Sequence, residues 1–217
     1  MTKMRYTFLT EPGIKRFLVI FYAVGITGLL VPSSFAFFVA LIPWTLLLNV
    51  ILLSLFHKDR YGIRSITVFL LICISSFVIE VAGVKTGQVF GNYAYGNSLG
   101  IKLLNTPLII GLNWLLLTYT TSSVLETLRM PLTVKIAASS FLMVIYDFVL
   151  EKVAPRLDMW SWINDSAPLR NYIMWFLMAA MYHALIKVSG VKTDNPLSAV
   201  ILVSQFVFLT VLSIFLR

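Results

Sequence analysis

Long apolar runs alternate with short polar stretches along this chain. Seven runs are present, and each approaches the roughly 20 residues that a helix needs to cross the hydrocarbon core of a bilayer. They cover about residues 17–31, 35–56, 65–84, 106–125, 134–150, 171–188 and 197–216. Helices are expected, because an open sheet would leave backbone groups unpaired in lipid. The pattern predicts an all-α, polytopic membrane protein with seven transmembrane helices in one integral domain, 1–217.

Prolines are expected to mark the ends of these helices. Those at or just before predicted helix starts are Pro32, Pro107, Pro131, Pro168 and Pro196. Pro43 lies inside the second apolar run instead, so we expect it to kink that helix.

Composition supports a membrane location. The chain is 59% hydrophobic and 12% charged, whereas a soluble domain carries about 25% charged residues. Its net charge of +8 comes from basic residues scattered through the loops, so no basic patch indicates nucleic-acid binding. The segments on the side of the N-terminus hold 11 Lys and Arg residues, and the opposite segments hold 6. This bias predicts a cell (inner) membrane protein with its N-terminus in the cytoplasm and its C-terminus outside.

Two long connections, 85–105 and 151–170, are predicted to lie on the same face of the membrane. Their sequences resemble each other, since each follows an acidic residue and places two aromatic residues 13 and 15 positions after it. These residues are Glu80, Tyr93 and Tyr95 in the first case, and Asp147, Trp160 and Trp162 in the second. A proline and then a helix with Asn and Trp follow each time: Pro107, Asn113 and Trp114, or Pro168, Asn171 and Trp175. We interpret helices 3–4 and 5–6 as parallel repeats of one unit; coincidence among aromatic-rich loops is the alternative.

Acidic residues within apolar helices are candidates for function, because each costs about 2.5–3.5 kcal/mol at the centre of a membrane helix. Glu80 is either such a residue or the partner of Lys85 at the membrane edge. Asp147 and Glu151 are four residues apart and share one helix face. A carboxylic acid kept protonated in such a place can give its proton to a poor base. Glu151 could instead pair with a neighbouring cation.

The aromatic residues of the loops have two interpretations. Tyr and Trp commonly form a belt at the membrane interface. Their π faces can also stabilise a cationic intermediate, by about 2 kcal/mol when water is excluded.

The two histidines, His57 and His183, are expected to be solvated and structurally hydrogen-bonded, respectively. The sequence contains no cluster with metal-ligand spacing, and a retinal protein is excluded because no lysine lies within residues 197–216.

Residues 80–95, EVAGVKTGQVFGNYAY, followed by Leu99-Gly100, Pro107 and Trp114, resemble a family signature. So does the second set, formed by Asp147, Pro155, Trp160-Ser-Trp162, Pro168, Asn171 and Trp175. The similarity is to membrane carotenoid 1,2-hydratases, which include the bisanhydrobacterioruberin hydratases, and it covers roughly residues 75–180.

The resemblance implies hydration of the terminal C1–C2 double bond in an acyclic carotenoid end group, without a cofactor. The residues suit this chemistry, since a weakly basic alkene needs a strong proton donor in a water-poor place. We expect Asp147 and Glu80 to be acid and base, in an order left open, with Glu151 as a third catalytic candidate. The residues expected to bind the substrate or orient the water are Tyr93, Tyr95, Trp160, Trp162, Asn113, Trp114, Asn171 and Trp175. The carotenoid would enter from the bilayer, and other enzymes of its pathway are candidate partners.

Alternative functions stay open at this point. A lycopene-type cyclase uses the same protonation but captures the cation with an internal double bond. A proton-coupled transporter would use Glu80 and Asp147 to relay protons, and a membrane protein without activity is the remaining alternative.

Overall fold

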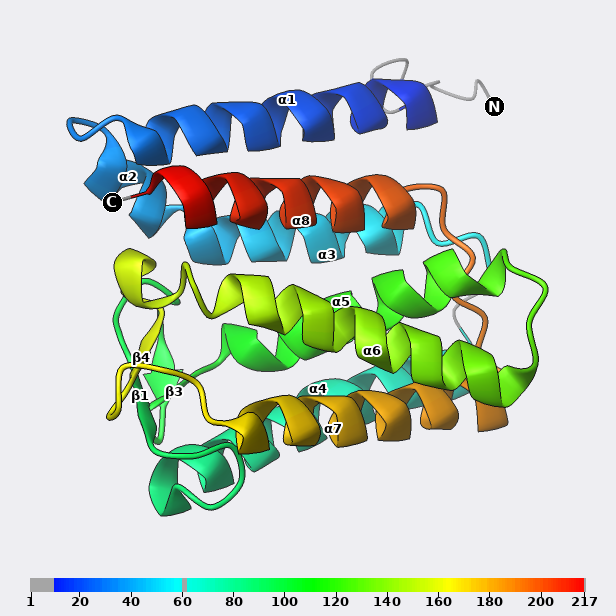
Figure 1. Cartoon of the computed structure of the whole chain (residues 1–217). Helices are drawn as coiled ribbons and strands as arrows, with labels where there is room; N and C mark the ends of the chain where they lie inside the picture. The colour runs from blue at the N-terminus through cyan, green and yellow to red at the C-terminus, as the bar shows by residue number, and fades with distance from the viewer. Residues whose placement is uncertain (1–9, 60–61, 217) are drawn as a thin grey trace.

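Helices make up most of the chain. The computed structural model describes residues 10–59 and 62–216. Its helices are α1 (Glu11–Leu30), α2 (Phe35–Ala40), α3 (Ile42–Leu55), α4 (Ile63–Thr86), α5 (Ile109–Glu126), α6 (Leu132–Leu150), α7 (Leu169–Val188) and α8 (Ser198–Phe215), with a 3-10 turn, η1 (Pro155–Leu157). The long helices lie side by side in one bundle (Figure 1). The prediction of a mainly helical fold is confirmed.

Four of the described helices, α1, α4, α6 and α8, are long and apolar enough to cross a membrane. The number of seven crossings goes beyond this finding and stays a prediction. The second apolar run, predicted as one helix over 35–56, is divided between α2 and α3. The break falls at Leu41, and Pro43 occupies the first turn of α3. Proline lacks a backbone N–H, and the N–H groups of the first helical turn have no partner within the helix, so proline is tolerated at a helix start and not in a helix interior.

The helix α5 occupies the middle of the bundle (Figure 1). It packs against α3, α4, α6, α7 and α8, and nearly all of its residues from Ile110 to Ser123 are buried. Its close approach to α4 depends on Gly111, because a Cβ atom there would lie 2.4 Å from the backbone oxygen of Cys73. The other close helix pairs are α6 with α7 and α1 with α8.

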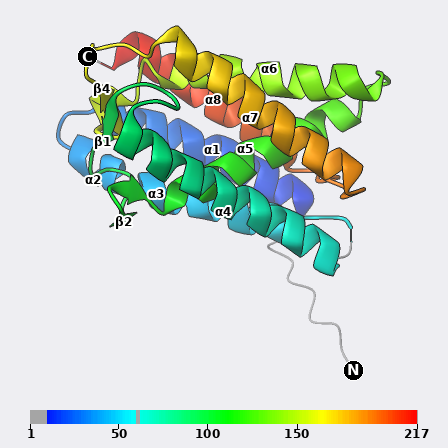
Figure 2. The ribbon, with the colours of Figure 1, turned by 90° about the horizontal axis from the view of Figure 1, so that it is seen from below.

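Short strands, which the sequence did not predict, join the two long connections at one end of the bundle (Figures 1 and 2). β1 (Tyr93–Tyr95) pairs antiparallel with β4 (Trp160–Trp162), while β2 (Lys102–Leu103) pairs with β3 (Thr106–Pro107). Alternating aromatic residues favour extended backbone, and these segments lie outside the apolar runs. The pairing confirms that the two connections lie on the same side of the protein.

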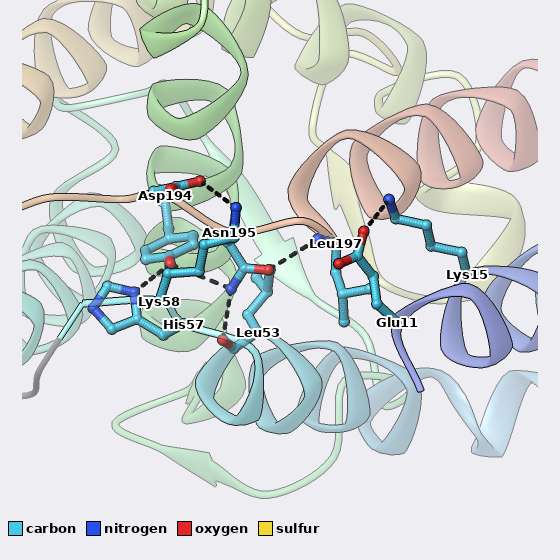
Figure 3. A network of polar contacts seen from close by, with 9 residues as sticks. Glu11, Lys15, Leu53, His57, Lys58, Asp194, Asn195 and Leu197 are labelled. Carbon is cyan, nitrogen blue, oxygen red and sulfur yellow. Dashed lines mark hydrogen bonds and ion pairs between the residues drawn. The ribbon is translucent and has the colours of Figure 1, made fainter. Parts of the chain in front are cut away.

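A polar network closes the opposite end of the bundle (Figure 3). Asn195, in the connection from α7 to α8, donates from Nδ2 to the backbone oxygen of Leu53 at 2.7 Å and accepts from the backbone N–H of Leu197 at 3.0 Å. Lys58 and Asp194 form an ion pair at 3.3 Å. The start of α1 lies at this end and the end of α8 lies at the strand end (Figure 1), so the described chain begins and finishes on opposite sides.

Candidate active site

Glu80 lies near the end of α4 and is buried, with 4% of its surface exposed. Three side chains donate hydrogen bonds to its carboxyl group. The hydroxyls of Tyr93 and Tyr95 lie 2.6 and 2.8 Å from Oε2, and the indole N–H of Trp114 lies 2.9 Å from Oε1. Such donors stabilise the charged form of a buried carboxyl group. Gly83, on the same face of α4, makes room for this arrangement, because a Cβ atom there would lie 3.2 Å from the Tyr93 hydroxyl.

The pairing of β1 with β4 brings the two aromatic pairs into contact. Tyr93 lies opposite Trp162, and Tyr95 lies opposite Trp160. The ring centres of these pairs are 5.1 and 6.0 Å apart. All four residues therefore form one aromatic cluster at the strand end of the bundle.

Glu151 follows the last residue of α6 and lies on the other side of this cluster. Its Oε2 accepts hydrogen bonds from the indole N–H groups of Trp162 and Trp160, at 2.6 and 3.2 Å. Burial raises the pKa of the Glu151 carboxyl to about 7, although the two indole donors oppose that shift. The side chain is consequently able to hold a proton at neutral pH and to release it. The alternative, an ion pair of Glu151 with Lys152 or Arg156, is absent from the described residues.

Asp147 is completely buried one helical turn earlier on α6. The side-chain amide of Asn171, on α7, donates to Asp147 Oδ2 at 2.7 Å. The other oxygen, Oδ1, is buried and has no hydrogen-bond partner among residues 10–59 and 62–216. Asp147 thus fixes the neighbouring helix through Asn171.

The tryptophans of the two helix pairs stack on each other at the centre of the site. Trp114 of α5 and Trp175 of α7 have ring centres 4.2 Å apart, with an angle of 29° between the ring planes. Because Trp114 also donates to Glu80, this stack connects α7 to the acid on α4.

A small cavity lies between Glu80 and Glu151. Its volume is about 20 Å³, and roughly 10–15 Å³ is enough for one water molecule. The other residues that line it are Phe90, Tyr93, Tyr95, Ile110, Asn113, Trp160, Trp162, Asn171 and Trp175. Asp147 is not among its lining residues. The cavity is therefore polar on several sides and has a carboxyl group at two of them.

A second and larger cavity adjoins the first. It has a volume of about 320 Å³ and is lined almost entirely by apolar side chains of α1, α2, α3, α5, α6, α8 and the two long connections. Ile110, Asn113 and Trp160 belong to the walls of both cavities. A long apolar molecule held in the large cavity would have its tip at this shared wall, next to the two glutamates.

The residues proposed from the sequence meet in this site, with one change of arrangement. The sequence pattern matched Asp147 with Glu80, but the acid that contacts Trp160 and Trp162 is Glu151. The physical reason is that the chain turns through η1 immediately after α6, which brings the tryptophans back to the end of that helix. Sequence reasoning missed Phe90 and Ile110 as lining residues, because apolar residues in an apolar chain carry no distinguishing signal.

The histidines lie elsewhere. His183 contacts the backbone oxygen of Ala179 at 2.6 Å and the Thr121 hydroxyl at 2.9 Å, which agrees with a structural role. His57 lies 2.6 Å from the Tyr119 hydroxyl at the opposite end of the bundle and is partly buried rather than solvated. In the part of the chain that the structure describes, no group of three or more His, Cys, Asp or Glu residues could hold a metal ion.

The family model of the carotenoid biosynthesis proteins matches residues 41–217. The chain belongs to the carotenoid biosynthesis protein family. Comparison with the curated proteins and with the solved structures found no match. Membership of the carotenoid biosynthesis family agrees with the resemblance in the sequence. Together with the apolar helices, it indicates a membrane protein of the carotenoid pathway that contacts lipid and carotenoid.

Proposed function

We propose that this protein adds water to the terminal C1–C2 double bond of an acyclic carotenoid end group. One observation carries the proposal: a water-sized polar cavity between Glu80 and Glu151 shares a wall with a large apolar cavity. Hydration needs this combination, because the alkene must lie in an apolar place while water and a proton donor reach its end.

The apolar cavity would hold the end of the substrate. At about 320 Å³ it is at the small end of ligand pockets, which span roughly 300–1,000 Å³. It therefore accepts one end of a long polyene, and the rest of the molecule stays in the bilayer. The reactive tip would lie against Asn113 and Trp160 in the shared wall.

Glu151 is the proton donor in this proposal. It lines the small cavity, and its pKa of about 7 leaves it protonated in a large fraction of molecules at neutral pH. Its proton adds to C2 of the alkene and leaves a tertiary cation at C1. Trp160 and Tyr95, whose ring centres lie 6.0 Å apart in an edge-to-face arrangement, would stabilise that cation through a π face.

Glu80 is the base. Its carboxyl group already accepts three hydrogen bonds from aromatic side chains, which favours the carboxylate. A water molecule in the small cavity adds to C1 and transfers one proton to Glu80, so the net change is the addition of H to C2 and OH to C1. Return of a proton from Glu80 to Glu151 through solvent completes the cycle.

Asp147 takes a positioning role rather than that of the acid or base. It does not line the small cavity, but its partner Asn171 does. Asn171, held at 2.7 Å by Asp147, presents its amide to the water, and Asn113 is the second amide at that place. Trp114 and Trp175 close the site from the side of α5 and α7.

The repeat of two helix pairs also belongs to this proposal. In each unit a pair of aromatic side chains donates hydrogen bonds to a glutamate, and the two units meet through β1 and β4. The stacked pair Trp114 and Trp175 comes from matching helices of the two units. These contacts support an approximate twofold relation, with α4 and α5 in one unit and α6 and α7 in the other.

The activity is tested by expression in a host that makes lycopene. A hydratase gives products that are heavier by one or two water molecules, whereas a cyclase gives products of unchanged mass. The Glu80→Gln variant should accumulate at the wild-type level and leave lycopene unconverted. Cyclised products, or no conversion by a well-expressed wild-type protein in the presence of its partner enzymes, would refute hydration.

The proposed membrane orientation has a separate test. A cytoplasmic N-terminus and an external C-terminus place the site at the outer face of the cell membrane. A reporter enzyme fused after residue 217 should then be active only in its exported form. Activity of a cytoplasmic reporter at that position would reverse the orientation.

A further inference from the structure

The wall of the apolar cavity contains a cluster of polar side chains that the hydration mechanism does not use. Tyr22 of α1, Tyr146 of α6 and Gln205 of α8 all belong to its wall, and all three are buried. Behind them, Asn49 of α3 donates from Nδ2 to the Tyr22 hydroxyl at 2.7 Å and to the backbone oxygen of Thr45 at 2.7 Å. Four helices therefore each contribute a polar side chain to one point of an otherwise apolar wall.

Gln205 interacts with the hydroxyls of both Tyr22 and Tyr146, yet these groups satisfy one another incompletely. The Tyr146 hydroxyl and Gln205 Oε1 are 3.5 Å apart, which is at the limit of a hydrogen bond. An amide has two N–H donors besides its carbonyl oxygen, and burying such a group without good partners costs free energy. Asn49 Oδ1, also buried, has no partner in the described part of the chain. Tyr146 and Gln205, which line the cavity, thus leave hydrogen-bonding capacity toward a ligand-sized space.

The cluster lies close to the acids along the bundle. Tyr146 precedes Glu151 by five residues, which corresponds to about 7.5 Å along a helix. A ligand with its tip at Glu151 would therefore place atoms a few bonds from that tip beside Tyr146 and Gln205.

We propose that Gln205 and Tyr146, supported by Tyr22 and Asn49, form a binding subsite for a hydroxyl or carbonyl oxygen of the polyene. This subsite makes the protein select polyenes that carry an oxygen near one end over pure hydrocarbons. The inference depends on the proposed function only in taking the apolar cavity as the polyene site. Tyr22, on α1, lies outside residues 41–217, the region that matches the carotenoid biosynthesis family. One residue of the subsite therefore comes from a helix that the family match does not cover.

The test measures binding to the purified full-length protein in detergent. The ligands are lycopene and a lycopene derivative with one hydroxyl group near an end, and quenching of tryptophan fluorescence reports the Kd. We expect the wild-type protein to bind the hydroxylated ligand roughly three to ten times more tightly, which is the net effect of about one hydrogen bond. Gln205→Leu should abolish this preference and keep the affinity for lycopene within about twofold of the wild type.

Two further variants keep the experiment decisive. Tyr146→Phe removes only the hydroxyl and should reduce the preference, even if Gln205→Leu fails to fold. Thr210→Val is the matched control on α8, because the Thr210 hydroxyl bonds its own helix at the backbone oxygen of Phe206 and lines neither cavity. It should retain the full preference.

The outcomes separate the two proposals. Equal affinity of the wild-type protein for both ligands, or an undiminished preference in both Gln205→Leu and Tyr146→Phe, overturns the subsite and leaves hydration standing. Failure of the wild-type protein to bind either polyene overturns the cavity as the substrate site, and the subsite with it.

Discussion

Replacement of Glu151 by glutamine tests the proposed proton donor most directly. Glu151→Gln keeps the size of the side chain, and its amide oxygen can take the place of Oε2, which accepts from both Trp160 and Trp162. The change therefore removes the transferable proton while the aromatic cluster stays in position. Loss of a general acid commonly slows a reaction by about 10²–10⁴-fold, and we expect a decrease of that order in the rate of product formation.

The change of the reaction rate with pH gives a second, independent test of Glu151 as the proton donor. With a pKa raised to about 7, the carboxyl group is protonated in about half of the molecules at pH 7 and in about one tenth at pH 8. A reaction that needs the protonated form is therefore fast below the pKa and slows as the pH rises through it. The wild-type rate should fall by about tenfold between pH 6 and pH 8, and the small residual rate of Glu151→Gln should lack this step.

The assay follows carotenoid products by mass in isolated membranes at several pH values. Glu126→Gln is the matched control, because Glu126 pairs with Lys135 and Lys187 at the far ends of α6 and α7. It should keep the wild-type rate and pH profile. A Glu151→Gln protein that is folded by its melting temperature and works at the wild-type rate would refute the assignment of the proton donor.

Two further changes test the base and the packing of the bundle. Tyr95→Phe removes one hydrogen bond to Glu80. Because a hydrogen bond to a charged group contributes about 1.5–3 kcal/mol, the rate of product formation should fall about tenfold or more in the same assay. An unchanged rate would contradict the role of Glu80. Gly111→Ala brings a Cβ atom within 2.4 Å of the Cys73 backbone oxygen, so we expect about 1–3 kcal/mol of destabilisation, seen as a lower melting temperature. Gly62→Ala is its control, because a Cβ atom there meets nothing within 4 Å, and equal melting temperatures of the two variants would show that the α4–α5 contact adapts freely.

The amino-acid pattern alone determined that the chain is helical and built for a membrane, because length and hydropathy limit what can lie in lipid. The same pattern singled out Glu80 and Asp147, since a carboxyl group in an apolar helix is costly and therefore conspicuous. It also identified the aromatic residues of both connections, whose alternating spacing recurs.

Tertiary structure decided how these residues are grouped. Hydropathy cannot show that the connections pair as strands, because strand pairing joins residues far apart in the chain and depends on where the helices end. That pairing places Glu151, rather than Asp147, against the tryptophans and puts a water-sized space between two glutamates. The apolar cavity was equally hidden from the sequence, since a side chain that lines a cavity and one that faces lipid have the same hydrophobic character, and only packing distinguishes them.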